Sequence, residues 1–279
     1  MFEFLFYQID LQLIKNICFF IFSESKKFNC LSKQKDKKME YTIPLLILLS
    51  TGASFVQRVC GFGFGIFIMT MLPYILPTYG EATTLSGMLS AAQSIYIIRT
   101  HYKYINWKHL VPIMITFLIF SFISIGFVAS ASESHLKILL GIILILMSLY
   151  FLFINRHIHV KPSIKLQISM GTISGVMGGL FGMQGPPAVL YFLTSEKSKD
   201  EYLAIAQAYF LIGNIAMTIF RAGHGFLTHE VCIDWVYAFI GVIFGSILGK
   251  YVFDKISADT LRKIVYIYMI ISGVIAIVS

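Results

Sequence analysis

The chain has 279 residues, of which 57% are hydrophobic and 13% are charged, and its mean hydropathy is +0.78. Soluble domains carry about 25% charged residues, so this composition excludes a soluble globular protein and indicates a surface that faces lipid. The formal net charge of +8 is spread over several loops, which is typical of a membrane-topology signal and excludes a nucleic-acid-binding face. The apolar runs are long and do not alternate, which argues against a membrane β-barrel and predicts an all-α polytopic membrane protein.

Residues 1–38 differ from the rest of the chain. The apolar stretch at 9–22 is too short and too charged to cross a bilayer well. Residues 23–38 hold six lysines and few apolar residues, a composition that predicts disorder. Met39 comes directly before the first convincing membrane segment, so we expect the basic extension to lie outside the native protein or, alternatively, to form a cytoplasmic arm.

Ten apolar segments follow, starting at Tyr41. A full crossing needs about 20 apolar residues, and the first two segments of each half are shorter than that. We therefore predict that each short pair forms a hairpin of short or half-membrane helices, and that the other three segments of each half cross fully. The segments are 41–57, 64–79, 82–99, 109–129 and 136–154 in the first half, and 165–180, 185–194, 201–220, 232–253 and 260–278 in the second.

A glycine-rich break interrupts the first hairpin at Gln57–Gly65, which has the sequence QRVCGFGFG. Gly61, Gly63 and Gly65 are poor helix formers. In a membrane, non-helical backbone must line a cavity or be buried in protein. This first break is therefore a candidate part of a binding site.

The second half has a matching break at Gly178–Pro187, with the sequence GGLFGMQGPP. Gly182 and Gly185 would let the backbone approach a ligand, and Gln184 could hydrogen-bond to one. Pro186 and the proline after it cannot donate backbone hydrogen bonds and force an extended entry into the next short helix. A pair of Gly/Pro-broken hydrophobic segments in matching places is the best sequence pointer to the binding site of a transporter.

The order of landmarks indicates that the two halves are copies. Gly63 aligns with Gly182 at an offset of 182 − 63 = 119, and further matched landmarks follow: Glu81 with Glu201, Trp107 with Trp235, and Leu136 with Leu261. We expect the two glutamates, which stand where segments begin, to cap helix N-termini. The pattern predicts one membrane transport domain over 39–279, with repeat one at about 41–154 and repeat two at about 165–278.

Loop charge predicts that the second copy is inverted. Loops 99–109 and 155–165 each carry three Lys or Arg residues and loop 250–263 carries four, so the positive-inside rule places all three in the cytoplasm. Loop 221–231 has one arginine balanced by a glutamate and is expected outside. Equivalent loops thus have opposite sidedness, and an odd number of segments per copy also inverts the second copy.

Arg58 is the charged candidate for the site, because it lies where the first short segment breaks. A guanidinium there suits a planar or tetrahedral oxyanion; alternatively, the side chain extends to the nearer membrane interface. Backbone N–H groups exposed at the breaks also favour anions. The predicted substrate-binding residues are Arg58, Gln57, Gly61, Gly63, Gly65, Gly182, Gln184, Gly185, Pro186 and Asn214.

For the other polar residues the sequence gives weaker support for a role in substrate binding. Gln207 lies seven residues before Asn214 on the same helix face, but Gln207 and Gln93 could equally tie helices together. Arg221 lies at a segment end and is expected to be an interface residue. No group of residues has metal-ligand spacing, and no ATPase or catalytic motif is present.

The glycine-rich stretches resemble those of the sulfite exporter TauE/SafE family of membrane transporters. The similarity rests on GFGFGIFIMTMLP at Gly61–Pro73 and GVMGGLFGMQGPP at Gly175–Pro187, and it extends over roughly 40–279. The resemblance implies duplicated halves and export of sulfite, thiosulfate or organosulfonates across the bacterial inner membrane. Gln184 and Pro186 stand in and near a position where many members have a run of glycines, which leaves the particular anion open.

We therefore expect a secondary transporter that exports a small sulfur-containing anion by alternating access, with no enzymatic activity, cofactor or metal. Its partners are expected to be the anion and the bilayer, with a proton as one candidate coupling ion and no nucleic acid. The alternative hypotheses are a small-anion channel and a transporter for an unrelated small metabolite.

Overall fold

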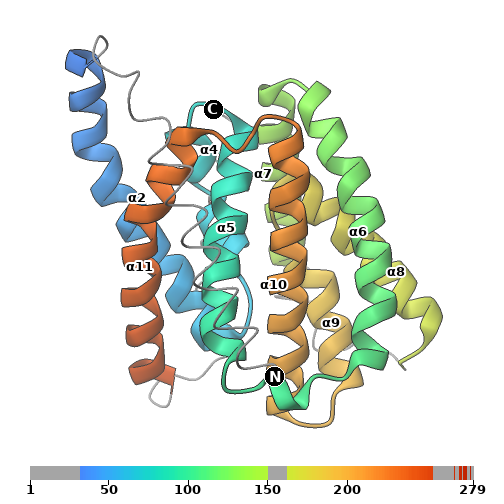
Figure 1. Ribbon diagram of the computed structural model, residues 1–279. Coiled ribbons are helices and arrows are strands. Elements are labelled where there is room, and N and C mark those ends of the chain that lie inside the picture. The colour runs from blue at the N-terminus through green and yellow to red at the C-terminus, as the bar shows by residue number, and fades with distance from the viewer. Residues whose placement is uncertain are drawn as a thin grey trace.

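The computed structural model describes residues 32–149 and 162–253, together with a few helical residues between 267 and 277. This part of the chain is helical and contains no strand (Figure 1). The helices are α2 (Ser32–Cys60), α3 (Phe64–Ile68), α4 (Leu72–Ile75), α5 (Tyr79–Ile98), the 3-10 turn η2 (Tyr102–Tyr104), α6 (Trp107–Ser130), α7 (Glu133–Leu149), α8 (Ile164–Phe181), α9 (Gly185–Ser195), α10 (Lys199–Gly223) and α11 (His229–Phe253).

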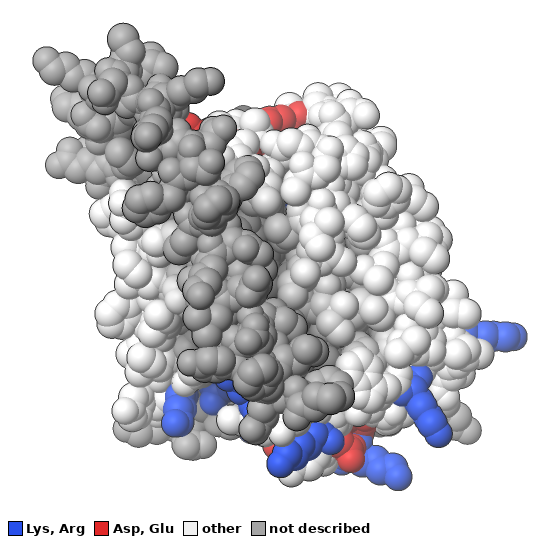
Figure 2. Space-filling model, viewed as in Figure 1, with Lys and Arg blue, Asp and Glu red and all other residues white. Residues whose placement is uncertain are grey.

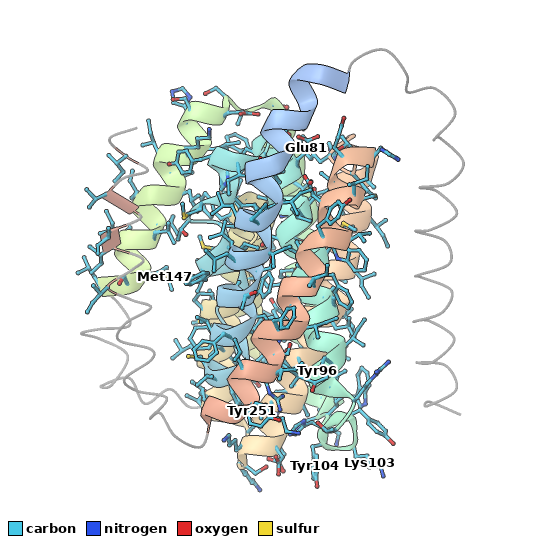
Figure 3. The ribbon with its side chains drawn as sticks, turned by 90° about the vertical axis from the view of Figure 1, so that its left-hand side faces the viewer. Glu81, Tyr96, Lys103, Tyr104, Met147 and Tyr251 are labelled. Carbon is cyan, nitrogen blue, oxygen red and sulfur yellow. The ribbon has the colours of Figure 1, made fainter. Side chains whose placement is uncertain are left out.

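Within the described part of the chain, four helical stretches are long and apolar enough to cross a membrane: Thr42–Cys60, Trp107–Ser130, Lys199–Gly223 and His229–Tyr251. The charges fit a membrane protein as well. In Figure 2 the Lys and Arg side chains in view gather toward the lower end of the molecule. Figure 3 places Glu81, in the first turn of α5, at the upper end, and Lys103, which follows α5, at the lower end. The positive-inside rule predicts that the lower end is the cytoplasmic side.

The prediction of two short helices in the first hairpin is wrong for its first member. Helix α2 continues without interruption to Cys60 and contains a stretch long enough to cross by itself. Gly52 does not break it, because the space that a side chain would fill is occupied by the ring of Phe67. The second members are short as predicted: α3 and α4 have five and four residues and α9 has eleven.

The basic extension also differs from expectation where it is described. Helix α2 begins at Ser32, so residues 32–38 are helical although their composition predicts disorder. Lysine and glutamine are good helix formers, and a helix that is already established in α2 can extend into them. Residues 1–31 lie outside the described part of the chain, as do loop 155–161 and most of segment 260–278.

Glycine stripes explain how the long helices pack. Gly171, Gly175 and Gly179 are spaced by four on α8, and the space beside each is filled by backbone or side-chain atoms of α6. Gly241, Gly245 and Gly249 form the same stripe on α11, against α2. Small residues at this spacing let membrane helices approach closely, which maximises van der Waals contact where lipid gives no hydrophobic drive.

Helices from the two halves of the chain are interleaved. The main packing partners are α2 with α11, α6 with α8, and α5 with α10, and each pair takes one helix from each half. Gly273, in the last apolar segment, lies against the backbone of Gly141 on α7. The short helices α4 and α9 lie toward opposite ends of the molecule (Figure 1).

Two matched helix starts confirm the predicted capping role of the glutamates. Thr78 and Glu81 form a capping box at the start of α5, and Ser198 and Glu201 form one at the start of α10. In each box the hydroxyl accepts from the glutamate N–H, while the carboxylate accepts from the N-cap N–H. This exchange satisfies two N–H groups that a helix start leaves unpaired.

Candidate functional site

Left-handed glycines form both breaks. Gly61 and Gly63 have φ of 80° and 105° in the first break, and Gly182 has φ of 68° in the second, where it ends α8. A side chain at such φ values is strained, so glycine is the residue that fits. Gly63 and Gly182, aligned from the sequence alone, therefore share a backbone conformation as well as a place in the pattern.

The two breaks touch each other. A Cβ atom on Gly65 would lie 2.2 Å from the carbonyl oxygen of Gly182, so the backbones are in direct contact and any larger residue would separate them. The Ser86 hydroxyl lies beside both glycines, 3.7 Å from a Cβ built on either. That hydroxyl is buried and has no hydrogen-bond partner among the described residues.

A small cavity lies at this contact and is called the site cavity below. Its volume is about 20 Å³, which is room for about one water molecule. Seven of the ten predicted site residues line it. The full lining is Gln57, Gly63, Phe64, Gly65, Ile66, Ser90, Gly182, Met183, Gln184, Gly185, Phe210 and Asn214.

Two amide side chains give the site cavity its polarity. Gln184 is 4% exposed; its Nε2 donates to the Phe210 carbonyl at 3.4 Å, and its Oε1 is buried without a partner in the described structure. Asn214 donates from Nδ2 to the Ser90 hydroxyl at 3.0 Å. A buried polar atom that lacks a partner is costly. Gln184 Oε1 only accepts, so it suits a donor such as water, whereas the Ser86 hydroxyl can also donate to a ligand oxygen.

Gln57 and Gln207 hold the first break against α10. Gln57 Nε2 donates to Gln207 Oε1 at 3.1 Å, and Gln207 Nε2 donates to the Gly61 carbonyl at 2.9 Å. Gly61 thus contributes a backbone carbonyl and does not line the site cavity, and Pro186 is buried beside it without lining it. Gln207 acts on the break directly, which sequence reasoning left open.

Gln93 serves a different purpose. Its Oε1 accepts from the hydroxyls of Ser54 at 2.8 Å and Ser246 at 2.6 Å. These three residues come from α5, α2 and α11, so Gln93 ties three helices together away from the site cavity. For this residue the structure favours the helix-tying interpretation.

Arg58 does not line the site cavity. It is partly exposed, its aliphatic stem lies against Gly249 on α11, and its guanidinium carbon is 5.9 Å from the centre of the Tyr96 ring. Successive helix residues are rotated by about 100°, so Arg58 points away from the direction in which Gln57 reaches α10. The second of the two sequence interpretations, a side chain that leaves the site, describes this geometry.

Arg221 is the buried cation that the sequence prediction missed. It is 1% exposed, not an interface residue as expected. Its Nη1 donates to the Thr83 carbonyl at 3.0 Å, and its Nη2 donates to the carbonyls of Gly178 at 2.8 Å and Gly179 at 3.3 Å. The signal that could have found it is spacing: Gln207, Asn214 and Arg221 recur every seven residues on one face of α10. We call these three residues the α10 stripe.

No group of three or more His, Cys, Asp or Glu residues that could hold a metal ion is found in the described ranges. The polar groups at the site cavity are amides, hydroxyls and backbone. Such groups bind polar or anionic ligands by hydrogen bonds.

Comparison with protein-family models matches residues 46–275 to the family described as Sulfite exporter TauE/SafE. The chain belongs to this family. The match runs from α2 to the last apolar segment, and it includes both breaks and the α10 stripe. The resemblance seen in the glycine-rich stretches is thereby confirmed, and the chain is a multi-pass membrane protein of a transporter family.

Two curated relatives of this TauE/SafE protein cover most of its length. The "Probable sulfite/organosulfonate exporter TauE" of Cupriavidus necator is 24% identical over 243 residues, which is 82% of this chain and 92% of the relative. A "Probable membrane transporter protein" of Methanocaldococcus jannaschii is 28% identical over 244 residues, 79% of this chain and 90% of the relative. No solved structure matches the chain significantly.

Proposed function

We propose that this protein is a secondary transporter that exports a small sulfur-containing oxyanion, such as sulfite, thiosulfate or an organosulfonate, across the bacterial inner membrane. The observation that carries the proposal is the site cavity: Gly65 meets Gly182 there, the unpaired Ser86 hydroxyl lies beside that contact, and the Gln184 and Asn214 amides line the cavity. The family description and the printed name of the Cupriavidus relative support the substrate class.

The breaks suit an anion. Gln184 and Gly185, at the start of α9, line the site cavity. The N-terminal turn of a helix carries a partial positive charge and leaves N–H groups unpaired, and because Pro186 and the proline after it have none, the backbone donors here are those of Gln184 and Gly185. The Asn214 amide uses one N–H on the Ser90 hydroxyl, and its second N–H can donate to an oxyanion.

Alternating access by two inverted repeats fits the packing. Each repeat contributes one helix to the pairs α2–α11, α6–α8 and α5–α10. The matched left-handed glycines and the matched capping boxes support the repeat assignment. A cavity with room for about one water is too small for sulfite, so the breaks must separate before the anion binds. This closed arrangement favours a carrier over an open pore.

The test is flux of sulfite, thiosulfate, sulfoacetate and taurine in proteoliposomes. We expect saturable flux of at least one of them by the wild type and a loss of roughly tenfold or more in Gln184→Ala, because a buried polar ligand contact is removed. Gln167→Ala is the matched control: Gln167 also lies in the α8–α9 hairpin, where it donates to the Tyr191 hydroxyl away from the site cavity. Wild-type protein that moves none of the four would refute the substrate class, and normal flux in Gln184→Ala would refute the site.

A further inference from the structure

We infer that Arg221 provides the positive charge that binds the anion and, through the same hydrogen bonds, couples anion binding to release of the second break. This inference rests on the proposed function, since it names the residue that would recognise the charge of the substrate. Arg221 stands outside the sequence-predicted site and does not line the site cavity in its present closed form.

The first argument is that the charge of Arg221 is not compensated. Its hydrogen bonds go to three backbone carbonyls, and within residues 32–149 and 162–253 no carboxylate forms an ion pair with it. Carbonyl oxygens satisfy the N–H groups, but they carry no net charge. A buried cation of this kind is costly, and in a membrane protein such residues commonly mark a substrate or ion pathway.

The second argument is that the guanidinium is continuous with the polar wall of the site cavity. A Cβ built on Gly87 would lie 3.4 Å from Arg221 Nη1, 3.6 Å from Asn214 Oδ1 and 3.7 Å from Thr218 Oγ1. Asn214 lines the site cavity, and Ser90, one helical turn from Gly87 on α5, lines it too. A polar path therefore leads from the site cavity past Gly87 to the guanidinium.

The third argument comes from unpaired groups around Arg221. Tyr79 lies close enough to interact with it electrostatically, and the Tyr79 hydroxyl is buried without a hydrogen-bond partner in the described structure. The hydroxyl of Ser86, next to Gly87 in the chain, is unpaired as well. A ligand oxyanion would offer acceptors to both hydroxyls and a counter-charge to Arg221.

The coupling follows from what Arg221 now holds. Gly178 and Gly179 belong to the last turn of α8, and Gly182 ends that helix at the contact with the first break. When the guanidinium binds an anion in place of these carbonyls, the end of α8 loses its charged attachment to α10. A ligand shifts a conformational equilibrium by its difference in affinity for the two states, and the anion gains Arg221 only in the state where the break is released.

A purely structural role would make Arg221 a cap for the C-terminal carbonyls of α8. The structural role and the anion-binding role differ in whether they require the positive charge of Arg221. A structural cap needs donors that a neutral side chain can partly supply, whereas an anion site needs the positive charge itself.

The test measures the apparent affinity of the purified full chain for sulfite, thiosulfate and sulfate, from anion-induced thermal stabilisation at constant ionic strength. Arg221→Gln keeps hydrogen-bond donors and removes the charge, and we expect it to weaken oxyanion binding roughly 10- to 100-fold. Arg221→Lys keeps the charge and should lose less than Arg221→Gln. Equal affinity in wild type and Arg221→Gln would overturn the inference.

A matched pair at Gly87 tests the same point if Arg221→Gln fails to fold. Gly87→Asp places a carboxylate beside the guanidinium, whereas Gly87→Asn has the same size and no charge. We expect the Asp variant to bind oxyanions at least tenfold more weakly than the Asn variant, because the fixed carboxylate occupies Arg221. Equal binding by the pair would overturn the inference.

The outcomes separate this inference from the transport proposal. Wild-type flux with unchanged oxyanion affinity in Arg221→Gln leaves the transport proposal standing and removes the role of Arg221. Oxyanion binding that depends on Arg221, without flux of any substrate, supports the role of Arg221 and refutes the transport proposal. Wild-type protein that binds no oxyanion and moves none refutes both.

Discussion

The two breaks differ in how α10 holds them. At the first break a neutral amide does so: Gln207 donates to the Gly61 carbonyl at 2.9 Å and accepts from Gln57. At the second break a cation does so, because Arg221 donates to the carbonyls of Gly178 and Gly179. One helix thus holds two similar glycine breaks, the first by neutral hydrogen bonds alone and the second by a cation in addition to the neutral bond from Gln184 to the Phe210 carbonyl.

The difference indicates which break an anion can open. An oxyanion competes strongly with a carbonyl for a guanidinium, because it brings a full opposite charge and can accept two parallel N–H bonds, whereas a carbonyl carries no net charge. It gains much less from an amide such as Gln207. We therefore expect the second break to respond directly to the substrate, and the first break to move because its contact with the second is lost.

The largest effect is expected where the breaks touch. Gly65→Ala places a Cβ 2.2 Å from the Gly182 carbonyl oxygen, and no flexible side chain is there to move aside. We expect a loss of about 3 kcal/mol or more in the free energy of unfolding, together with loss of transport. Thermal unfolding in detergent and proteoliposome flux measure the two effects.

The control for Gly65→Ala is Gly223→Ala at the end of α10. A Cβ at Gly223 meets nothing within 4 Å and its φ is not in the left-handed region. That variant should retain stability and flux. Wild-type behaviour of Gly65→Ala would show that the breaks do not need to meet.

The neutral attachment of the first break is tested by Gln207→Leu. The substitution leaves the Gly61 carbonyl and the Gln57 amide without their partner, which should cost about 1–3 kcal/mol of stability and loosen the first break. The matched control is Gln93→Leu, which removes a similarly buried amide that holds helices and not a break. We expect both variants to lose similar stability, but only Gln207→Leu to alter the transport rate. Equal transport rates in the two variants would show that the attachment of the first break by Gln207 has no special role in transport.

The left-handed glycine of the second break gives a smaller effect. In Gly182→Ala the neighbours of the new Cβ lie at 3.7 Å or more, so the cost is backbone strain of about 1–2 kcal/mol. Gly225→Ala imposes the same kind of strain at φ of 78° with nothing within 4 Å. Both should lower the melting temperature by similar amounts, and only Gly182→Ala should slow flux. If Gly225→Ala slows flux equally, the effect belongs to general destabilisation.

Local sequence signals predicted much of this structure because their causes are local. The all-helical membrane class follows from composition, and the break positions follow from glycines whose left-handed backbone needs no distant partner to explain it. The capping glutamates Glu81 and Glu201 follow from helix-start chemistry. The inverted order of the repeats stays a prediction, supported by packing.

What the sequence could not supply is the direction in which long side chains point. Arg58 and Arg221 are both arginines near the ends of apolar segments, and adjacency to the first break favoured Arg58. The rotation of α2 turns Arg58 toward α11, whereas the face of α10 that carries Gln207 and Asn214 turns Arg221 inward. Only the seven-residue spacing on α10 distinguishes the two residues in advance.

The smallest expected effect therefore belongs to Arg58. Arg58→Ala removes a partly exposed guanidinium over the Tyr96 ring, a contact worth about 0.5–1 kcal/mol, and leaves the site cavity intact. We expect the half-saturating concentration for transport to stay within about twofold of wild type, because an interaction outside the binding site contributes equally to free and bound protein. Titrating flux against substrate concentration for Arg58→Ala and Arg221→Gln side by side measures this. A large rise in half-saturation for Arg58→Ala alone would mean that the anion binds near α2 and α11, and that the charged attachment of the second break serves only to hold the fold.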